Sequence, residues 1–269
     1  MNINLDKNRI MKKYLVIGGH GFIGSYFCKR LIANGCKDFD IYDINEPNGD
    51  PSPEVIKFRK SVLPKSISLE NIKNTEYEYC VHFGSYAGIR SKRNPLDYIS
   101  NNVYALQELI KILNVVKFVY ISSSSVLGDV ETPYSLSKKI AENIVSTIPE
   151  SLIVRPFTVY GKNGRPEMFI TKLINNPKVT VNGDPTKIKR RFTYVEDLID
   201  CILDCIDDTG VVNAIGGHVY SLKNLLDIFG NKYDQVEQDP SDFTKQTFNK
   251  SDRDYLCRTM IEDVKEQLK

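Results

Sequence analysis

A tyrosine and a lysine four residues apart are the side chains of this sequence best suited to acid-base chemistry. They close the stretch 118–138, FVYISSSSVLGDVETPYSLSK, in which an apolar run and four serines precede Tyr134 and Lys138. If the last part opens a helix, both side chains lie on one face, a turn apart. A nearby ammonium favours the phenolate and would lower the pKa of Tyr134, which could then act as a base. A serine hydroxyl at the end of the preceding strand could hold a substrate oxygen against that phenol.

Such a pair also occurs by chance on surface helices, so the elements around it must support the chemistry. Residues 13–18, KYLVIG, are typical of a strand that stops at glycine, and helical spacing resumes over 25–33. The glycines between them can bring backbone amides close to a pyrophosphate at a helix N-terminus. This pattern predicts a dinucleotide site at Gly18, Gly21 and Gly24.

An acidic residue follows the second predicted strand, 38–42, about 20 residues beyond the glycines. The carboxylate of this residue, Asp43, can bind the adenosine ribose hydroxyls, and its charge repels a 2′-phosphate. The sequence therefore favours NAD over NADP as the cofactor.

Further strands alternate with helices along the first half of the chain. They are expected at 55–59, 78–83, 117–121 and 152–156, with helices near 95–113 and 133–147. This alternation predicts an α/β fold, a Rossmann-type doubly wound parallel sheet with ligands at the carboxyl ends of the strands. We expect residues 11–157 to form the NAD-binding domain and residues 158–269 mostly a small C-terminal substrate-binding lid. A strand and helix within about 188–215 are expected to return to the first domain.

Composition and charge exclude several classes of protein. The 269 residues carry a net charge of +2 and no basic stripe, so nucleic acid is not expected as a partner. No apolar run is long enough to span a membrane and no signal peptide is evident, which predicts a soluble, cytoplasmic protein. The six cysteines lack a CxxC pair and are expected to be reduced, and no metal site is predicted. His82 ends an apolar strand and is interpreted as a core residue.

Basic residues cluster between 187 and 191 in a turn-rich segment. Such a cluster is usually a solvated face. Alternatively, one arginine could clamp the diphosphate of a ligand. Both interpretations stay open for Lys187, Lys189, Arg190 and Arg191.

With these motifs placed, the chain resembles the extended short-chain dehydrogenase/reductase family of nucleotide-sugar epimerases and dehydratases. The motifs are GGHGFIG, VHFGSYAG, SSSSV and the Tyr134/Lys138 pair. Within that family it is most similar to UDP-glucuronate 4-epimerases, which share the patterns found at 82–90, 155–168 and 190–197. Departures from the family pattern are Val126-Leu127-Gly128 for VYG, Ser61 for an acidic residue, Arg191 for aspartate and a shorter chain.

The resemblance implies roles for individual residues. Tyr134 would be the base, Lys138 would bind the nicotinamide ribose, and Ser123 would take the position of the catalytic serine or threonine. The implied cofactor-binding residues are Gly18, Gly21, Phe22, Ile23, Gly24, Asp43, Gly84, Ser85, Ala87, Asn102, Ser122, Tyr134 and Lys138. The implied substrate-binding residues are Arg90, Ser124, Ser125, Thr158, Arg165 and Arg190.

The residue types at positions 124 and 125 help to distinguish dehydration from epimerisation. Dehydratases of the family carry Asp and Glu where this chain has Ser124 and Ser125, which leaves hydride removal and return as the expected reaction. The resemblance thus implies a 4-epimerase acting through a transient 4-keto intermediate, best assigned to UDP-glucuronate and UDP-galacturonate. Alternatives are an NAD(P)-dependent 4-keto-sugar reductase, a nucleotide-sugar dehydratase or decarboxylase, and a catalytically silent NAD-binding regulatory protein. A homodimer formed through the helices near 95–113 and 133–147 is also implied.

Overall fold

The large sheet is assembled from strands that lie far apart in the chain. The computed structural model describes residues 13–44, 63–87, 94–237 and 252–268. Seven parallel strands run in the order β12-β9-β5-β4-β3-β1-β2. Their bounds are Tyr14–Ile17 (β1), Phe39–Tyr42 (β2), Glu76–His82 (β3), Asn114–Ile121 (β4), Ser151–Pro156 (β5), Gly210–Gly216 (β9) and Arg253–Cys257 (β12). The strand order reverses between β1 and β3, where sheets of this kind bind ligands at the carboxyl ends of the strands.

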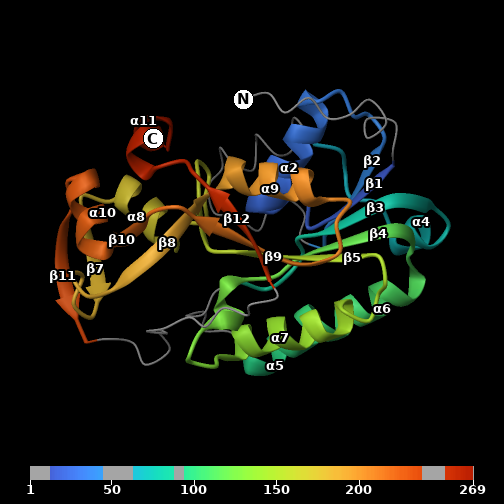
Figure 1. Cartoon of the computed structure of the whole chain (residues 1–269), viewed down its shortest axis with the longest axis horizontal. Coiled ribbons are helices and arrows are strands. Elements are labelled where there is room, and N and C mark those ends of the chain that lie inside the picture. The colour runs from blue at the N-terminus through green and yellow to red at the C-terminus, as the bar shows by residue number, and fades with distance from the viewer. Residues whose placement is uncertain (1–12, 45–62, 88–93, 238–251, 269) are drawn as a thin grey trace.

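Helices cover both faces of this sheet (Figure 1). The helices α2 (Phe22–Ala33) and α9 (Val195–Cys205) pack on one face, and α5 (Pro95–Ile99), α6 (Ala105–Ile112) and α7 (Pro133–Val145) cover the other. Because both faces are covered, β1 is a continuous apolar run, YLVI, that is buried throughout. The short helix α4 (Leu69–Lys73) precedes β3. The predicted doubly wound α/β sheet is confirmed.

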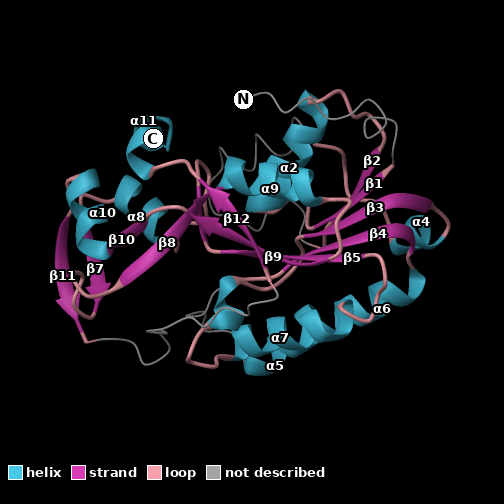
Figure 2. Cartoon of the chain, in the orientation of Figure 1, coloured by secondary structure: helices cyan, strands magenta, loops and turns pink. Residues whose placement is uncertain are grey.

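A smaller region gathers at one end of the molecule (Figure 2). It contains a three-stranded sheet, β10-β8-β6, and a pair of strands, β11-β7. The strands are Thr158–Tyr160 (β6), Lys178–Asn182 (β7), Lys189–Tyr194 (β8), Val219–Ser221 (β10) and Lys232–Val236 (β11). The helices are Phe169–Asn175 (α8), Leu222–Phe229 (α10) and Ile261–Leu268 (α11), and they share one apolar core with these strands.

Several predicted elements differ in detail from the structure. The strand expected at 55–59 lies outside the described residues. The helix expected near 95–113 is interrupted by a π-helical turn at Ser100–Tyr104. The segment 179–192, interpreted as turn-rich and basic, instead contains most of β7 and β8, and β7 pairs with β11 more than 50 residues later. No helix in the described ranges has the length and apolar character needed to cross a bilayer.

Candidate active site

The turn after β1 leaves no room for side chains at two of its glycines. Gly18 has a φ of 74°, and a Cβ there would lie 2.6 Å from the backbone nitrogen of Gly84. A Cβ on Gly24 would lie 2.2 Å from the carbonyl oxygen of Gly18. Helix α2 begins next, with Gly21 as its N-cap; in the described part of the chain no side chain caps it, and its first turn holds no acid. Its first amides, those of Phe22 and Ile23 included, thus face a space that suits a pyrophosphate.

Asp43 is held beside this turn, at the end of β2. One of its carboxylate oxygens accepts the backbone N–H of His20 at 3.0 Å, and its own N–H donates to Ser66 Oγ at 2.9 Å. The ring Nε2 of His20 donates to the carbonyl oxygen of Pro64 at 2.9 Å. The acid is therefore fixed next to the glycines, as binding of an adenosine ribose requires. The glycine turn and this carboxylate fit a dinucleotide such as NAD.

Asn102 lies in the π-helical turn Ser100–Tyr104 and ties the loop after β3 to α7. Its Oδ1 accepts the backbone N–H of Tyr86 at 2.7 Å, and its Nδ2 donates to the Tyr86 carbonyl and to Ser137 Oγ, each at 3.0 Å. The loop with Gly84, Ser85 and Ala87 is thereby held across the ends of β1 and β3, where Gly84 donates to the Ile17 carbonyl. π-Helical turns are frequent at functional sites. Asn102 thus orients the loop predicted to meet the cofactor.

Tyr134 opens α7 and contacts Ser123 at the end of β4. A capping box between Thr132 and Ser135, with Pro133 at the first helical position, fixes the start of the helix. Burial raises the pKa of Tyr134, whereas a hydrogen bond with Ser123 lowers it in part. The structure thus joins the two side chains predicted to handle the substrate hydroxyl.

Lys138 lies one turn further along α7 but points toward β4 rather than toward the phenol. Its Nζ donates to the Ile121 carbonyl at 2.8 Å and to the Tyr120 hydroxyl at 3.2 Å. Burial lowers the pKa of Lys138 to about 7, and the charge of Glu142 opposes that shift. The structure therefore differs from the expectation that an ammonium lowers the pKa of Tyr134: burial dominates, and the amine bonds elsewhere.

Arg165 supplies positive charge on the substrate side of Tyr134. Its guanidinium lies close enough to lower the pKa of that tyrosine in part, and it pairs with the exposed Glu167 at 3.2 Å. Ser124 and Ser125 are buried in the 3₁₀ turn that follows Ser123. Among the described residues, Ser125 Oγ has no hydrogen-bond partner. This set can meet a polar, negatively charged substrate.

Two further predicted substrate residues, Thr158 and Arg190, lie on strands of the small region. Thr158 is exposed at the start of β6, and Arg190 of β8 donates to the Lys189 carbonyl at 2.9 Å. Arg191 donates to the Gly216 carbonyl at 2.9 Å and so serves the fold. None of these three takes part in the contacts given above for Tyr134. Arg90 lies outside the described residues.

Sequence reasoning missed a buried charged cluster next to Ser123. Ser122, which is predicted to bind cofactor, donates its hydroxyl to Glu142. Glu142 also binds Arg155, and Arg155 in turn binds Asp252. Glu142 could have been found, because it follows Lys138 by four residues on the same helix face. Asp252 lies 97 residues from Arg155, and nothing local in the sequence marks their contact.

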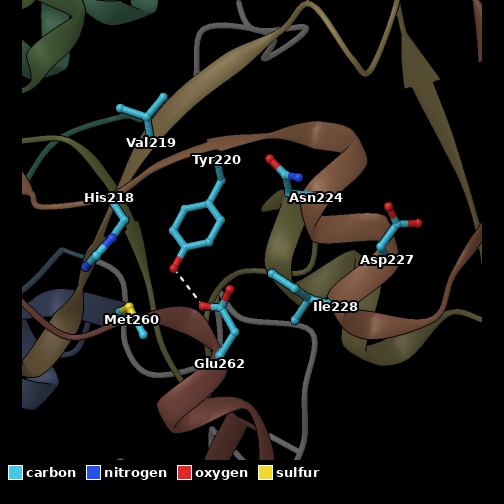
Figure 3. A pocket seen from close by; sticks show the side chains of 8 residues that line it. All are labelled: His218, Val219, Tyr220, Asn224, Asp227, Ile228, Met260 and Glu262. Atoms are coloured by element: carbon cyan, nitrogen blue, oxygen red, sulfur yellow. Dashed lines mark hydrogen bonds between the residues drawn. The ribbon is translucent and has the colours of Figure 1, made fainter.

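An open pocket elsewhere in the small region does not coincide with this site (Figure 3). It lies between β10, α10 and the start of α11, where Tyr220 donates to Glu262 at 2.7 Å. Asp227 pairs with Lys223, and Asn224 caps α10 through Ser221. Its Tyr220, Glu262, Asn224 and Asp227 side chains thus each have a partner within the protein, and no predicted site residue lines it.

Residues 14–216 match the model of the NAD dependent epimerase/dehydratase family, and the chain belongs to this family. Family membership confirms the predicted dependence on NAD. A UDP-glucuronate 4-epimerase of Thermodesulfobacterium geofontis is 29% identical over 258 residues, covering 81% of this chain and 80% of that protein. A dTDP-D-glucose 4,6-dehydratase of Dictyostelium discoideum is 27% identical over 272 residues, covering 84% of this chain and 61% of that protein.

Similarity to solved structures supports the fold. The UDP-glucuronic acid 4-epimerase of Bacillus cereus, in complex with UDP-glucuronic acid and NAD, superimposes with a TM-score of 0.72 at 22% identity. The match covers 95% of this chain and 92% of that one. At this identity the likeness establishes the shared architecture of sheet and small region.

Proposed function

We propose that this protein is an NAD-dependent nucleotide-sugar 4-epimerase that interconverts UDP-glucuronate and UDP-galacturonate. The observation that carries the proposal is the placement of the Arg165 guanidinium within electrostatic reach of the Ser123–Tyr134 pair. A guanidinium binds a carboxylate through two parallel hydrogen bonds. Its present partner, Glu167, is 61% exposed, so a substrate carboxylate could displace it without leaving a buried charge behind. A uronic acid supplies that carboxylate next to the carbon that reacts.

The chain's own groups account for the proton transfer. In its phenolate form, which the nearby charge of Arg165 and the hydrogen bond with Ser123 favour, Tyr134 would take the proton from the sugar 4-hydroxyl and return it after the 4-keto intermediate has turned in the pocket. Ser124 and Ser125 bring no carboxyl group that could expel water from the sugar, which argues for epimerisation over dehydration. Arg165 would hold the carboxylate of the keto acid and so oppose loss of carbon dioxide.

NAD would lie between the glycine turn and the loop after β3. Gly18, Gly24 and Gly84 let the turn after β1, the start of α2 and the loop after β3 pack closely against one another. The first amides of α2 would bind the pyrophosphate, and Asp43 the adenosine ribose. When bound, NAD supplies a hydride acceptor that can return the hydride to the opposite face of the sugar.

The test is to incubate the protein and NAD with a panel of UDP-sugars and to identify the products by NMR. We expect UDP-glucuronate and UDP-galacturonate to interconvert without net NADH formation or carbon dioxide release. Tyr134→Phe should slow this by about 10²–10⁴-fold. Net NADH turnover, water loss or carbon dioxide would indicate the reductase, dehydratase or decarboxylase alternatives. If UDP-glucuronate is not converted, the proposed substrate is wrong. If Tyr134→Phe behaves like the wild type in every assay, the protein is better explained as catalytically silent.

We further infer that the protein acts as a homodimer. Large apolar side chains are exposed on the adjoining helical elements α5, the π-helical turn and α7, at Leu96, Tyr104 and Leu136. Exposed apolar groups gathered on one side of a sheet are typical of a protein interface. A second copy facing this surface would bury them in a symmetric contact.

A further inference from the structure

Glu142 joins three parts of the site through its carboxylate. It lies on α7 one turn beyond Lys138 and is 7% exposed. Ser122 Oγ donates to its Oε1 at 2.5 Å, and the guanidinium of Arg155 donates to both of its oxygens, at 2.8 and 2.7 Å. Ser122 is also fixed by its N–H, which donates to the Val154 carbonyl of β5 at 2.8 Å. Glu142 therefore fastens the residue that directly precedes Ser123.

Arg155 connects this carboxylate to a second one. Its third donor nitrogen binds Asp252 at 2.5 Å, and the side chain of Asp252 is 4% exposed. Asp252 directly precedes β12, which lies two strands away from β5 in the sheet. Apolar residues can replace a buried ion network with little loss of stability, so stability alone does not explain this one. This network includes Glu142, which lies one turn from Lys138, and this position points to a role in the site.

The other titratable side chains that face Lys138 are neutral, so Glu142 provides the negative charge that balances its ammonium group. Tyr120 of β4 lies 3.2 Å away, and burial keeps its pKa well above the usual value, so it is neutral near pH 7. His82 of β3 is also neutral, because burial lowers its pKa to about 3. Tyr134 on α7 has a raised pKa and is neutral too. Arg155 and Asp252 lie behind Glu142 and carry opposite charges.

We propose that Glu142 is a positioning residue whose negative charge favours the ammonium form of Lys138 and whose bond to Ser122 fixes the turn that carries Ser123. Arg155 and Asp252 hold the Glu142 carboxylate in place. This inference rests on the proposed function, because it is there that Lys138 and Ser123 have their roles. It predicts that the charge of Glu142, and not only its shape, determines the protonation of Lys138.

The test follows the titration of Lys138 by NMR in protein labelled with ¹³C and ¹⁵N at lysine, with Lys138→Met identifying the signal. The ammonium form exists below the pKa, near 7 in the wild type, and is lost as the pH rises through it. Glu142→Gln keeps the size of the side chain and one acceptor oxygen, replaces the other oxygen by an NH2 donor, and removes the charge that raises this pKa. We expect the midpoint to fall by about one pH unit or more.

A second arginine between two carboxylates provides a matched control. Arg30 of α2 binds Glu196 and Asp200 of α9 on the other face of the sheet. Glu196→Gln removes one of those charges and should leave the Lys138 midpoint unchanged. Glu142→Asp retains the charge and should return the midpoint toward the wild-type value. Equal midpoints in the wild type and Glu142→Gln would overturn the proposal.

A further variant keeps the inference testable if Glu142→Gln does not fold. Asp252→Asn leaves Glu142 in place but makes it the sole carboxylate facing Arg155 in this cluster, so the midpoint of Lys138 should fall in the same direction by less. A midpoint unchanged in Asp252→Asn would then count against the proposal. The titration needs no sugar substrate, so its failure is distinguishable from failure of the epimerase assay. In an active enzyme, Glu142→Gln should also move the alkaline limb of the pH–rate profile to lower pH.

Discussion

Arg165 is the side chain that would separate a uronic acid from a neutral sugar in the proposed reaction. Arg165→Ala removes a charge-assisted pair worth about 1.5–3 kcal/mol, so kcat/KM for UDP-glucuronate should fall about 10- to 100-fold. Any turnover of UDP-glucose should change little, because that sugar has no carboxylate. Steady-state kinetics with both substrates measure the difference.

Glu167 offers the control for this substitution. Glu167→Gln breaks the same surface ion pair but leaves the guanidinium in place, so uronate turnover should be retained or rise. Undiminished uronate turnover in Arg165→Ala would show that another group holds the carboxylate. Thr158 and the buried Ser125, with its unpartnered hydroxyl among the described residues, would then be the next candidates.

The turn after β1 depends on the backbone geometry of Gly18, so a substitution there should affect NAD binding. In Gly18→Ala, the left-handed φ of 74° costs about 1–2 kcal/mol, and the new Cβ meets the Gly84 backbone at 2.6 Å. We expect the loop after β3 to shift and NAD affinity to fall at least about tenfold. Calorimetric titration with NAD measures the affinity, and thermal unfolding measures the strain.

A substitution at Gly35 separates the effect of backbone strain from the effect of the clash with the loop after β3. Its φ is 81°, but a Cβ there would have nothing within 4 Å. Gly35→Ala should therefore lower the unfolding temperature and leave NAD affinity as in the wild type. If Gly18→Ala also bound NAD normally, the contact between the ends of β1 and β3 would not form part of the cofactor site.

Much of the large sheet could be predicted because its signals are local. The apolar runs of β1, β4 and β5, and the glycines after β1, each report a buried parallel strand or a tight turn within a few residues. The strands of the small region were missed for the opposite reason. All five residues of β11 are exposed, and its partner β7 lies more than 50 residues away, so neither carries a continuous apolar signal.

The candidate site also combines features that local sequence predicts with features that depend on the folded chain. The helix spacing of Tyr134 and Lys138 was visible, but the direction of the lysine amine depends on the Ile121 carbonyl at the end of β4. The burial that raises the pKa of Tyr134 likewise comes from packing around α7. Local spacing thus placed both residues one turn apart on a helix, whereas their hydrogen-bond partners and their protonation depend on groups that only the folded chain brings together.

The surface formed by α5, the π-helical turn and α7 includes the helix that carries Tyr134 and Lys138, so a dimer there would couple assembly to the candidate site. Tyr104 is 62% exposed and Leu96 69% exposed. A charge at the centre of a buried apolar contact is costly, so Tyr104→Glu should convert a dimer into monomers. Light scattering after size-exclusion chromatography measures the mass. Val116→Glu, at the equally exposed start of β4, should remain dimeric. If the wild type is monomeric, or if Tyr104→Glu does not affect the dimer, this surface is not the dimer interface. Assembly would then not be coupled to the site through α7.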